Sequence, residues 1–424
     1  MIAYPSEAKR QSVVFTELLI TLSLVFTFFV AHGQFGTFSL QQSFLKHFVA
    51  VFLISASAME YFGYRLFSHD LDESQRLNTG SYWLCLCLLG AFIVCGSVYA
   101  RSELKIQDTF FINGLYILVG FAFSLTLRRN NLDRLINTVF WITLVFAIIV
   151  CVASIYARIV DLKVNETFIH EREFLVIPLI YVVVFGRVVR GWLRSLMLFL
   201  VIAAAGAALK NTPMIVLGLT LLMSYWRWWT DTEHIGRDTS KKTFATILGL
   251  AFLLTLLLAY AAFTYYVGGN TPKPNIDFRQ HQFGIAWKEF LDSPIVGKAF
   301  TGETGIYFNL WFDTTLGLRT LPTHNDVLDL LRAGGMVAFL LWFAPLSILY
   351  WRAFILLGNV AGKRAWDRKH DELAWLLLVN LAAVIVYSLN PLLSKTAFAA
   401  IVWIFFALLA AAVTRMRIDH AVTR

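Results

Sequence analysis

The sequence predicts an all-α polytopic integral membrane protein. Its 424 residues are 58% hydrophobic and only 15% charged, whereas a soluble domain carries about 25% charged residues. The mean hydropathy is +0.66, and the apolar residues gather into runs of the length that crosses a bilayer as a helix. These observations exclude a soluble globular enzyme and a disordered chain.

About twelve apolar runs are long enough for a membrane-spanning helix, which needs about 20 residues. The runs centre near residues 22, 54, 91, 118, 146, 181, 201, 220, 255, 340, 380 and 403. The first run follows Lys9 and Arg10 and lacks a small-residue cleavage site, so we expect a retained span. The chain is predicted to divide into three parts. Residues 1–267 form transmembrane helices 1–9, residues 268–325 form one large loop, and residues 326–424 form transmembrane helices 10–12.

The basic residues predict the orientation of these helices. Lys and Arg gather in alternate loops, most clearly in the short loops at 128–134 and 187–194. Cytoplasmic loops carry such an excess, so we expect both termini in the cytoplasm. The loop at 268–325 then lies outside, in the periplasm of a bacterial inner membrane. Orientation and contact with anionic lipids account for the inner cations.

Several cations on the predicted outer face are candidates for binding an anion. Lys210 stands in a tight turn before Pro213, at the start of a helix, where free N–H groups favour an anion. A lysine that snorkels to the interface is the alternative interpretation. The full set of candidates is Arg158, Arg172, Lys210, Arg279 and Arg319.

The stretch 276–291 in the large loop predicts an amphipathic helix that can lie on the membrane surface. Pro294 and Gly297 follow it and end it. The apolar residues expected on one face are Ile276, Phe283, Trp287 and Phe290.

Metal, nucleotide and nucleic-acid chemistry have no support in the sequence. The outer acidic residues form no Asp-x-Asp pair, so no metal and no cofactor is expected. The chain has no G-x-x-x-x-G-K-[ST] loop and no G-x-S-x-G elbow. Its basic residues are scattered over loops without a nucleic-acid-binding module.

His324 is the main candidate for proton transfer, because it is the best group on this face for titration near neutral pH. It precedes Asn325 and Asp326, either of which can cap the following helix. A structural or merely exposed histidine is the alternative, and His281 has a weaker claim.

Four short motifs follow one another in and after the large loop. Arg279 precedes a helix with Trp287, Pro294-x-x-Gly297 follows, and His324-Asn325-x-x-Leu328 comes before Gly334-Gly335. In this order the motifs resemble the O-antigen ligase and polymerase superfamily of bacterial membrane glycosyltransferases. Two positions depart from the family pattern: Lys210 replaces an arginine and so loses the bidentate fork, and Lys298 replaces a second glycine.

The resemblance implies a GT-C-like fold in which 268–325 is the catalytic periplasmic loop. It implies en bloc transfer of O-antigen glycan from undecaprenyl diphosphate to a sugar hydroxyl of lipid A–core, without metal and with inversion. His324 would act as the general base. Arg279, Lys210 and Arg172 would hold the diphosphate, with Arg158 and Arg319 as further candidates. The partners would be these two lipid substrates and membrane lipid; the oligomeric state is not specified.

Three alternatives to a ligase stay open at this point. An O-antigen polymerase and a protein O-oligosaccharyltransferase share the loop pattern, although the latter often carries additional periplasmic sequence. A lipid-linked sugar transporter belongs to another class and usually places charges at the bilayer midplane. Here the predicted spans are almost free of charge, with Glu17 and Glu60 as the main exceptions, which favours an enzyme that faces outward.

Overall fold

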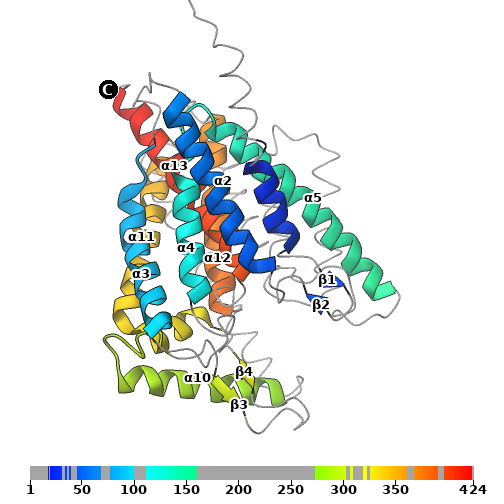
Figure 1. Cartoon of the computed structure of the whole chain (residues 1–424), viewed down its shortest axis with the longest axis vertical. Helices are drawn as coiled ribbons and strands as arrows, with labels where there is room; N and C mark the ends of the chain where they lie inside the picture. Colours follow the sequence, from blue (N-terminus) through cyan, green and yellow to red (C-terminus); the bar gives the residue numbers. More distant parts are fainter. Residues whose placement is uncertain are drawn as a thin grey trace, which may run out of the picture.

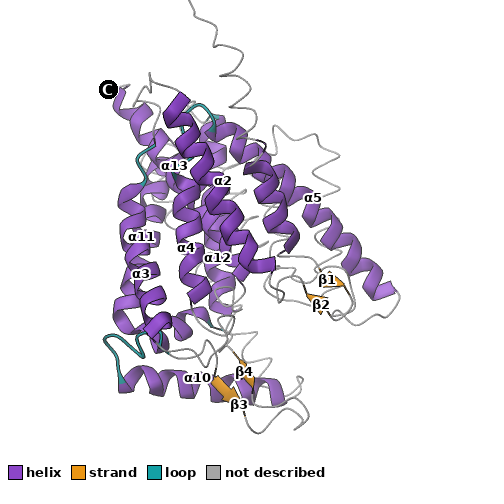
Figure 2. Cartoon of the chain, in the orientation of Figure 1, coloured by secondary structure: helices purple, strands orange, loops and turns teal. Residues whose placement is uncertain are grey.

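The structure, a computed structural model, describes most of the amino-terminal third and the carboxyl-terminal part of the chain. The described residues are 18, 20–30, 34–35, 38–39, 45–67, 77–99, 111–159, 273–301, 306–308, 319–321, 325–360, 367–389 and 396–422. Within them the fold is helical apart from two short strand pairs, and both pairs lie toward the same end of the molecule (Figure 2).

The helices follow the predicted apolar runs. A helix at Ile20–Val30 is followed by α2 (Leu45–Phe67), α3 (Gly80–Tyr99), α4 (Phe111–Ser124), α5 (Leu132–Ile159), α10 (Lys273–Asp292), α11 (Asp326–Val360), α12 (Arg368–Leu389) and α13 (Thr396–Val422). The strands pair antiparallel, β1 (Gln34–Phe35) with β2 (Phe38–Ser39) and β3 (Ile306–Phe308) with β4 (Arg319–Leu321).

The apolar helices identify a multi-pass membrane protein. In the described ranges, Gly80–Tyr99, Asp326–Gly358 and Ala399–Asp419 are long and apolar enough to cross a membrane. Shorter apolar helices cover Ile20–Val30, Phe48–Phe62 and Gly114–Ser124. The runs centred near residues 181, 201, 220 and 255 lie outside the described residues, so the number of twelve spans stays a prediction.

Helix α13 occupies the centre of the bundle. Of its apolar stretch 94% is buried, against 44% for α3 and for α11. The ring of Trp83 on α3 meets Phe406 on α13 edge-on, with 5.2 Å between the ring centroids. Helix α4 approaches α13 at Gly120, where a Cβ atom would come within 2.6 Å of the Trp403 Cβ atom. Small residues permit such close backbone approach in membrane bundles.

Helix α10 does not run with the bundle but lies across one end of it, while the carboxyl terminus of the chain lies at the other end (Figure 1). The amphipathic helix expected at 276–291 is thus present and slightly longer, and it ends at Asp292 before Pro294 as predicted. Since α10 lies outside the parallel array, it caps the bundle rather than crossing the membrane.

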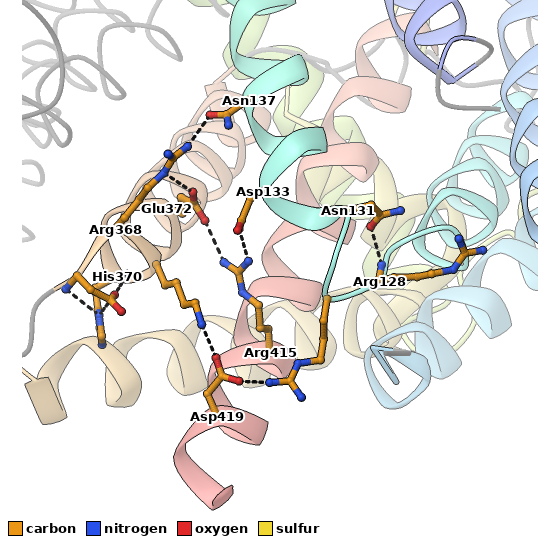
Figure 3. A network of polar contacts seen from close by, with 12 residues as sticks. Arg128, Asn131, Asp133, Asn137, Arg368, His370, Glu372, Arg415 and Asp419 are labelled. Atoms are coloured by element: carbon orange, nitrogen blue, oxygen red, sulfur yellow. Dashed lines mark hydrogen bonds and ion pairs between the residues drawn. The ribbon is translucent and has the colours of Figure 1, made fainter. Parts of the chain in front are cut away.

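Ion pairs join α5, α12 and α13 (Figure 3) at the end of the bundle opposite α10 (Figure 1). Arg415 of α13 contacts Asp133 of α5 and donates to Glu372 of α12 at 2.9 Å. Arg368 also donates to Glu372, at 3.1 Å, and reaches Asn137 of α5 at 3.0 Å. Glu372 therefore lies between two guanidinium groups from two helices.

A second set of charges extends this network. Asp419 contacts Arg129, and it accepts from the Lys369 ammonium at 2.8 Å (Figure 3). The sequence had accounted for the cations of this region by orientation and lipid contact alone. That interpretation was incomplete, because Arg129, Lys369 and their neighbours have carboxylate partners within the protein.

Asp367 caps the start of α12. Its carboxylate accepts from the backbone N–H of His370 at 3.2 Å, as an N-cap residue does. The His370 ring nitrogen Nδ1 lies 2.6 Å from the same oxygen. Partial burial acts to raise the pKa of Asp367, but the hydrogen bond and charge of His370 outweigh it and hold that pKa below its usual value.

Glu60 of α2 and Arg128, in the turn between α4 and α5, form a buried ion pair. The two guanidinium nitrogens donate to the two carboxylate oxygens at 2.9 and 3.1 Å. Glu60 is only 5% exposed and Arg128 only 7%. The pair explains Glu60, which the sequence analysis had noted as an exceptional charge in an apolar run.

We predict that Arg128→Met destabilises the protein by about 3–5 kcal/mol, because it leaves the Glu60 carboxylate buried without its counter-charge. The double variant Glu60→Leu/Arg128→Met should recover most of that loss. Denaturant unfolding in detergent micelles would measure both. Arg417→Met is the matched control, because Arg417 is exposed and such a change stays within about 0.5 kcal/mol. Equal stability of the Arg128 and Arg417 variants would contradict the prediction.

Candidate functional site

The segment after α10 packs against a break in α11. Gly335 interrupts the helix with φ 64° and ψ −163°. The N–H groups that follow the break donate outside their own helix, Met336 to the Pro294 carbonyl at 2.8 Å and Val337 to the Ile295 carbonyl at 3.0 Å. The predicted Pro294-x-x-Gly297 and Gly334-Gly335 motifs therefore lie in direct contact.

The carbonyl groups before the break are satisfied by the same segment. The Arg332 carbonyl accepts from the N–H of Lys298 at 3.3 Å, and the Ala333 carbonyl accepts from Phe300 at 2.9 Å. Non-helical backbone within a membrane bundle is tolerated where protein groups replace the lost helical hydrogen bonds. Segment 293–300 and the break in α11 supply these bonds to each other, and we call this arrangement the backbone interlock.

Two glycines are required by the backbone interlock. Gly297 has φ 54°, and a Cβ atom there would lie 2.7 Å from both the Arg332 carbonyl oxygen and the Gly335 nitrogen. Gly335 has a conformation that only glycine adopts readily, and a Cβ atom there would overlap the Ile295 carbonyl. Helix α3 also approaches closely, because a Cβ atom at Gly96 would overlap the carbonyl of Ala299.

Phe300 anchors the segment between α3 and α11. Its side chain is fully buried and stands edge-on to Phe92, with 5.1 Å between the ring centroids. Ala299 and Phe300 have positive φ values of 50° and 57°, a conformation that costs about 1–3 kcal/mol per residue where the surroundings enforce it. Burial of the aromatic ring offsets this cost.

Asn325 is the cap of α11. Its side-chain oxygen accepts from the backbone N–H groups of Val327 at 3.0 Å and Leu328 at 3.1 Å. The sequence had offered Asn325 or Asp326 for this role, and the geometry assigns it to Asn325. In the His324-Asn325-x-x-Leu328 motif, the asparagine thus defines where the helix starts, directly after the candidate base.

A charged cluster joins α10 to α11. Glu289 of α10 accepts from Lys298 at 2.7 Å and from Arg332 of α11 at 3.5 Å. Arg332 is 4% exposed, and its other nitrogen lies 3.6 Å from Asp329. This cluster was not predicted from the sequence. The position of Arg332 within an apolar run could have indicated it, because a charge in such a run needs a partner.

The predicted site residues are placed only in part. Arg279 lies on α10 and Arg319 begins β4, opposite Phe308 of β3. These two elements lie at the same end of the molecule (Figure 1). Arg158 lies in the last turn of α5. His324, Lys210 and Arg172 lie outside the described residues, so their convergence on one site remains a prediction.

Among the described residues, no group of three or more His, Cys, Asp and Glu side chains could hold a metal ion. The metal-free and cofactor-free chemistry expected from the sequence stays a prediction.

No model of a known protein family matches the chain, and no curated protein matches it. The resemblance to O-antigen ligases and polymerases therefore rests on the order of the four motifs and on the predicted spans, orientation and large loop.

We predict that Gly335→Ala destabilises the protein by at least about 1–3 kcal/mol, because an L-residue strains at this φ and its Cβ atom would meet the Ile295 carbonyl. Gly358→Ala on the same helix is the control. Nothing lies within 4 Å of a Cβ atom at Gly358, so this change should raise stability by about 0.4–1 kcal/mol. Denaturant unfolding of both variants in micelles measures the difference, and a Gly335→Ala protein as stable as the parent would contradict the interlock.

Proposed function

We propose that this protein is an inner-membrane glycosyltransferase that transfers O-antigen glycan en bloc from undecaprenyl diphosphate to lipid A–core, completing lipopolysaccharide. The observation that carries the proposal is the backbone interlock. It joins three of the four motifs on which the resemblance rests, namely the end of the tryptophan helix, Pro294–Gly297 and Gly334-Gly335. The fourth motif begins the same helix α11 through the Asn325 cap.

The proposed reaction is a single displacement. The oxygen of an acceptor sugar hydroxyl attacks the anomeric carbon of the glycan while the bond from that carbon to the diphosphate oxygen breaks. The hydroxyl proton passes to the neutral ring of His324, and undecaprenyl diphosphate leaves with the bonding electron pair. Attack opposite the leaving group inverts the anomeric carbon. A histidine suits this role because its pKa is near neutral pH.

The leaving diphosphate gains negative charge as its bond breaks, and cations stabilise that charge in the transition state. In this proposal, Arg279, Lys210 and Arg172 bind the diphosphate, with Arg158 and Arg319 as further ligands. Of these, Arg279 is the one carried by α10. The Glu289–Arg332 contact and the backbone interlock tie α10 to the start of α11.

This connection supports the proposal physically. Arg279 lies on α10, and the proposed base directly precedes in sequence the Asn325 cap of α11. In this proposal, the contacts between α10 and α11 serve to hold the helix of the diphosphate ligand against the helix that follows the base. Proximity of that kind contributes strongly to catalysis, since small displacements of reacting groups reduce rates severely. In the predicted orientation, this chemistry faces the periplasm.

The proposal predicts transfer in a reconstituted assay of the purified protein with undecaprenyl-diphosphate glycan and lipid A–core in the presence of EDTA. Electrophoresis should show the core band shifted to a glycan-bearing species. A donor glycan that lengthens while the core stays unmodified would identify a polymerase instead. Loss of transfer in EDTA that Mg²⁺ restores would contradict the metal-free mechanism.

His324→Ala should reduce the transfer rate by about 10²–10⁴-fold, the usual contribution of a general base. The protein should still insert and unfold as the parent does. His420→Ala is the matched control, because His420 lies on α13 near the carboxyl terminus, at the opposite end from α10. Parental turnover of the His324 variant would exclude the general-base role.

Arg279→Ala should raise KM for the diphosphate donor and leave KM for lipid A–core unchanged, because it removes a cation from the leaving group. Arg279→Lys should recover part of the loss, since it restores the charge without the bidentate fork. Steady-state kinetics with each substrate varied in turn would measure the separation. Equal effects on both KM values would show that Arg279 acts on the fold rather than on the donor.

A further inference from the structure

The face of helix α10 that contacts the bundle is not the most apolar face of this helix. Between residues 282 and 292, where the side chains are described, it buries Gln282, Ala286 and Phe290. Trp287 is 49% exposed and Leu291 57%, although the sequence placed Trp287 and Phe290 on one apolar face. The two rings do lie close, 5.2 Å between centroids. The helix is thus rotated so that only one edge of its apolar face meets the bundle.

The exposed apolar surface continues past the end of the helix. Ile295 is 68% exposed and Val296 44%. Their backbone is joined to α11 by the backbone interlock, in which Val337 donates to the Ile295 carbonyl. We call Trp287, Leu291, Ile295 and Val296 the apolar ridge.

The segment that carries Ile295 and Val296 is hydrogen-bonded to α11 where an exposed apolar stripe of that helix begins. Directly after the break, Met336 is 42% exposed and Val337 38%, and the exposure continues at Leu340 with 53% and Phe343 with 49%. Large apolar side chains left exposed along a membrane-spanning helix face lipid. The ridge is joined to this exposed stripe of α11. Lipid that covers Leu340 and Phe343 can therefore also cover the ridge.

We propose that the apolar ridge enters the phospholipid surface at the α10 end of the bundle, so that α10 lies in the membrane interface rather than in water. A tryptophan beside aliphatic residues is typical of that interface. The exposed Lys288 lies next to Trp287. Its charge complements the phosphates of the lipid headgroups.

A membrane-embedded ridge would also serve a substrate that arrives in the bilayer, but the inference does not depend on glycosyl transfer. It follows from exposure and connectivity alone. A loop that stood in water would expose four large apolar residues between positions 287 and 296, and soluble surfaces rarely carry such a group without a partner.

Nitroxide accessibility tests this inference on the full chain in vesicles of phosphatidylethanolamine and phosphatidylglycerol. Spin labels are attached to Trp287→Cys, Leu291→Cys and Ile295→Cys in a background with the four native cysteines replaced by alanine. Asp292→Cys is the matched control on the same helix, because this position is exposed and lies about 100° around the helix from Leu291.

The three ridge labels should collide more with oxygen, which concentrates in lipid, than with a water-soluble nickel chelate, and the control label should show the reverse. Nickel access at the ridge equal to that at the control would overturn the proposal. So would protection from both reagents with spin–spin broadening, which would indicate a second copy of the chain. If the cysteine-free background does not fold, benzoylphenylalanine at the same four positions of the native chain should crosslink to phospholipid from the ridge and not from the control.

Discussion

The structure at the α10 end of this protein depends on one physical constraint. Backbone polar groups inside a membrane bundle must form hydrogen bonds with other groups of the protein. The break at Gly335 removes helical hydrogen bonds from α11, and segment 293–300 replaces them on both sides. That exchange requires glycine at two contact points and an anchor at Phe300. The position of α10 across the bundle follows, since its carboxyl end is joined to the interlocked segment.

The two ends of the bundle are held together by different physical means. At the α10 end, backbone hydrogen bonds and close glycine contacts define the geometry, and a smaller charged cluster around Arg332 supports them. At the opposite end, ion pairs join separate elements: Glu60–Arg128 joins α2 to the turn between α4 and α5, and Glu372–Arg415 joins α12 to α13. Ion pairs tolerate small changes in helix spacing, whereas backbone contacts through glycine do not. A site that needs fixed distances is therefore better served by the α10 end.

The sequence predicted the elements well and their contacts poorly. The run centres near residues 54, 91, 340 and 403 all lie in helices. A cap of α11 at Asn325 or Asp326 was predicted, and Asn325 fills that role. Periodicity and capping are local signals, so the sequence contains them. The Glu289–Arg332 contact was missed, since its partners are 43 residues apart in the chain. Gly334-Gly335 was recognised as a motif, but a pattern does not state which segment it contacts. Likewise, the sequence predicted an apolar face on α10. It did not predict that the helix is rotated so that Trp287 on this face is exposed. The roles of His324 and the cations stay predictions.

The central place of α13 has a consequence for biosynthesis. Its apolar stretch is the most buried of the three candidate spans in the described part of the chain, yet it follows every other described helix in chain order. The ribosome therefore delivers the helices that surround the core before it delivers the core itself. Until α13 leaves the insertion machinery, Trp83 and Gly120 face a space that only lipid or another protein can fill. Assembly of this bundle is consequently a late event, in which the last described helix must enter among helices already in the membrane.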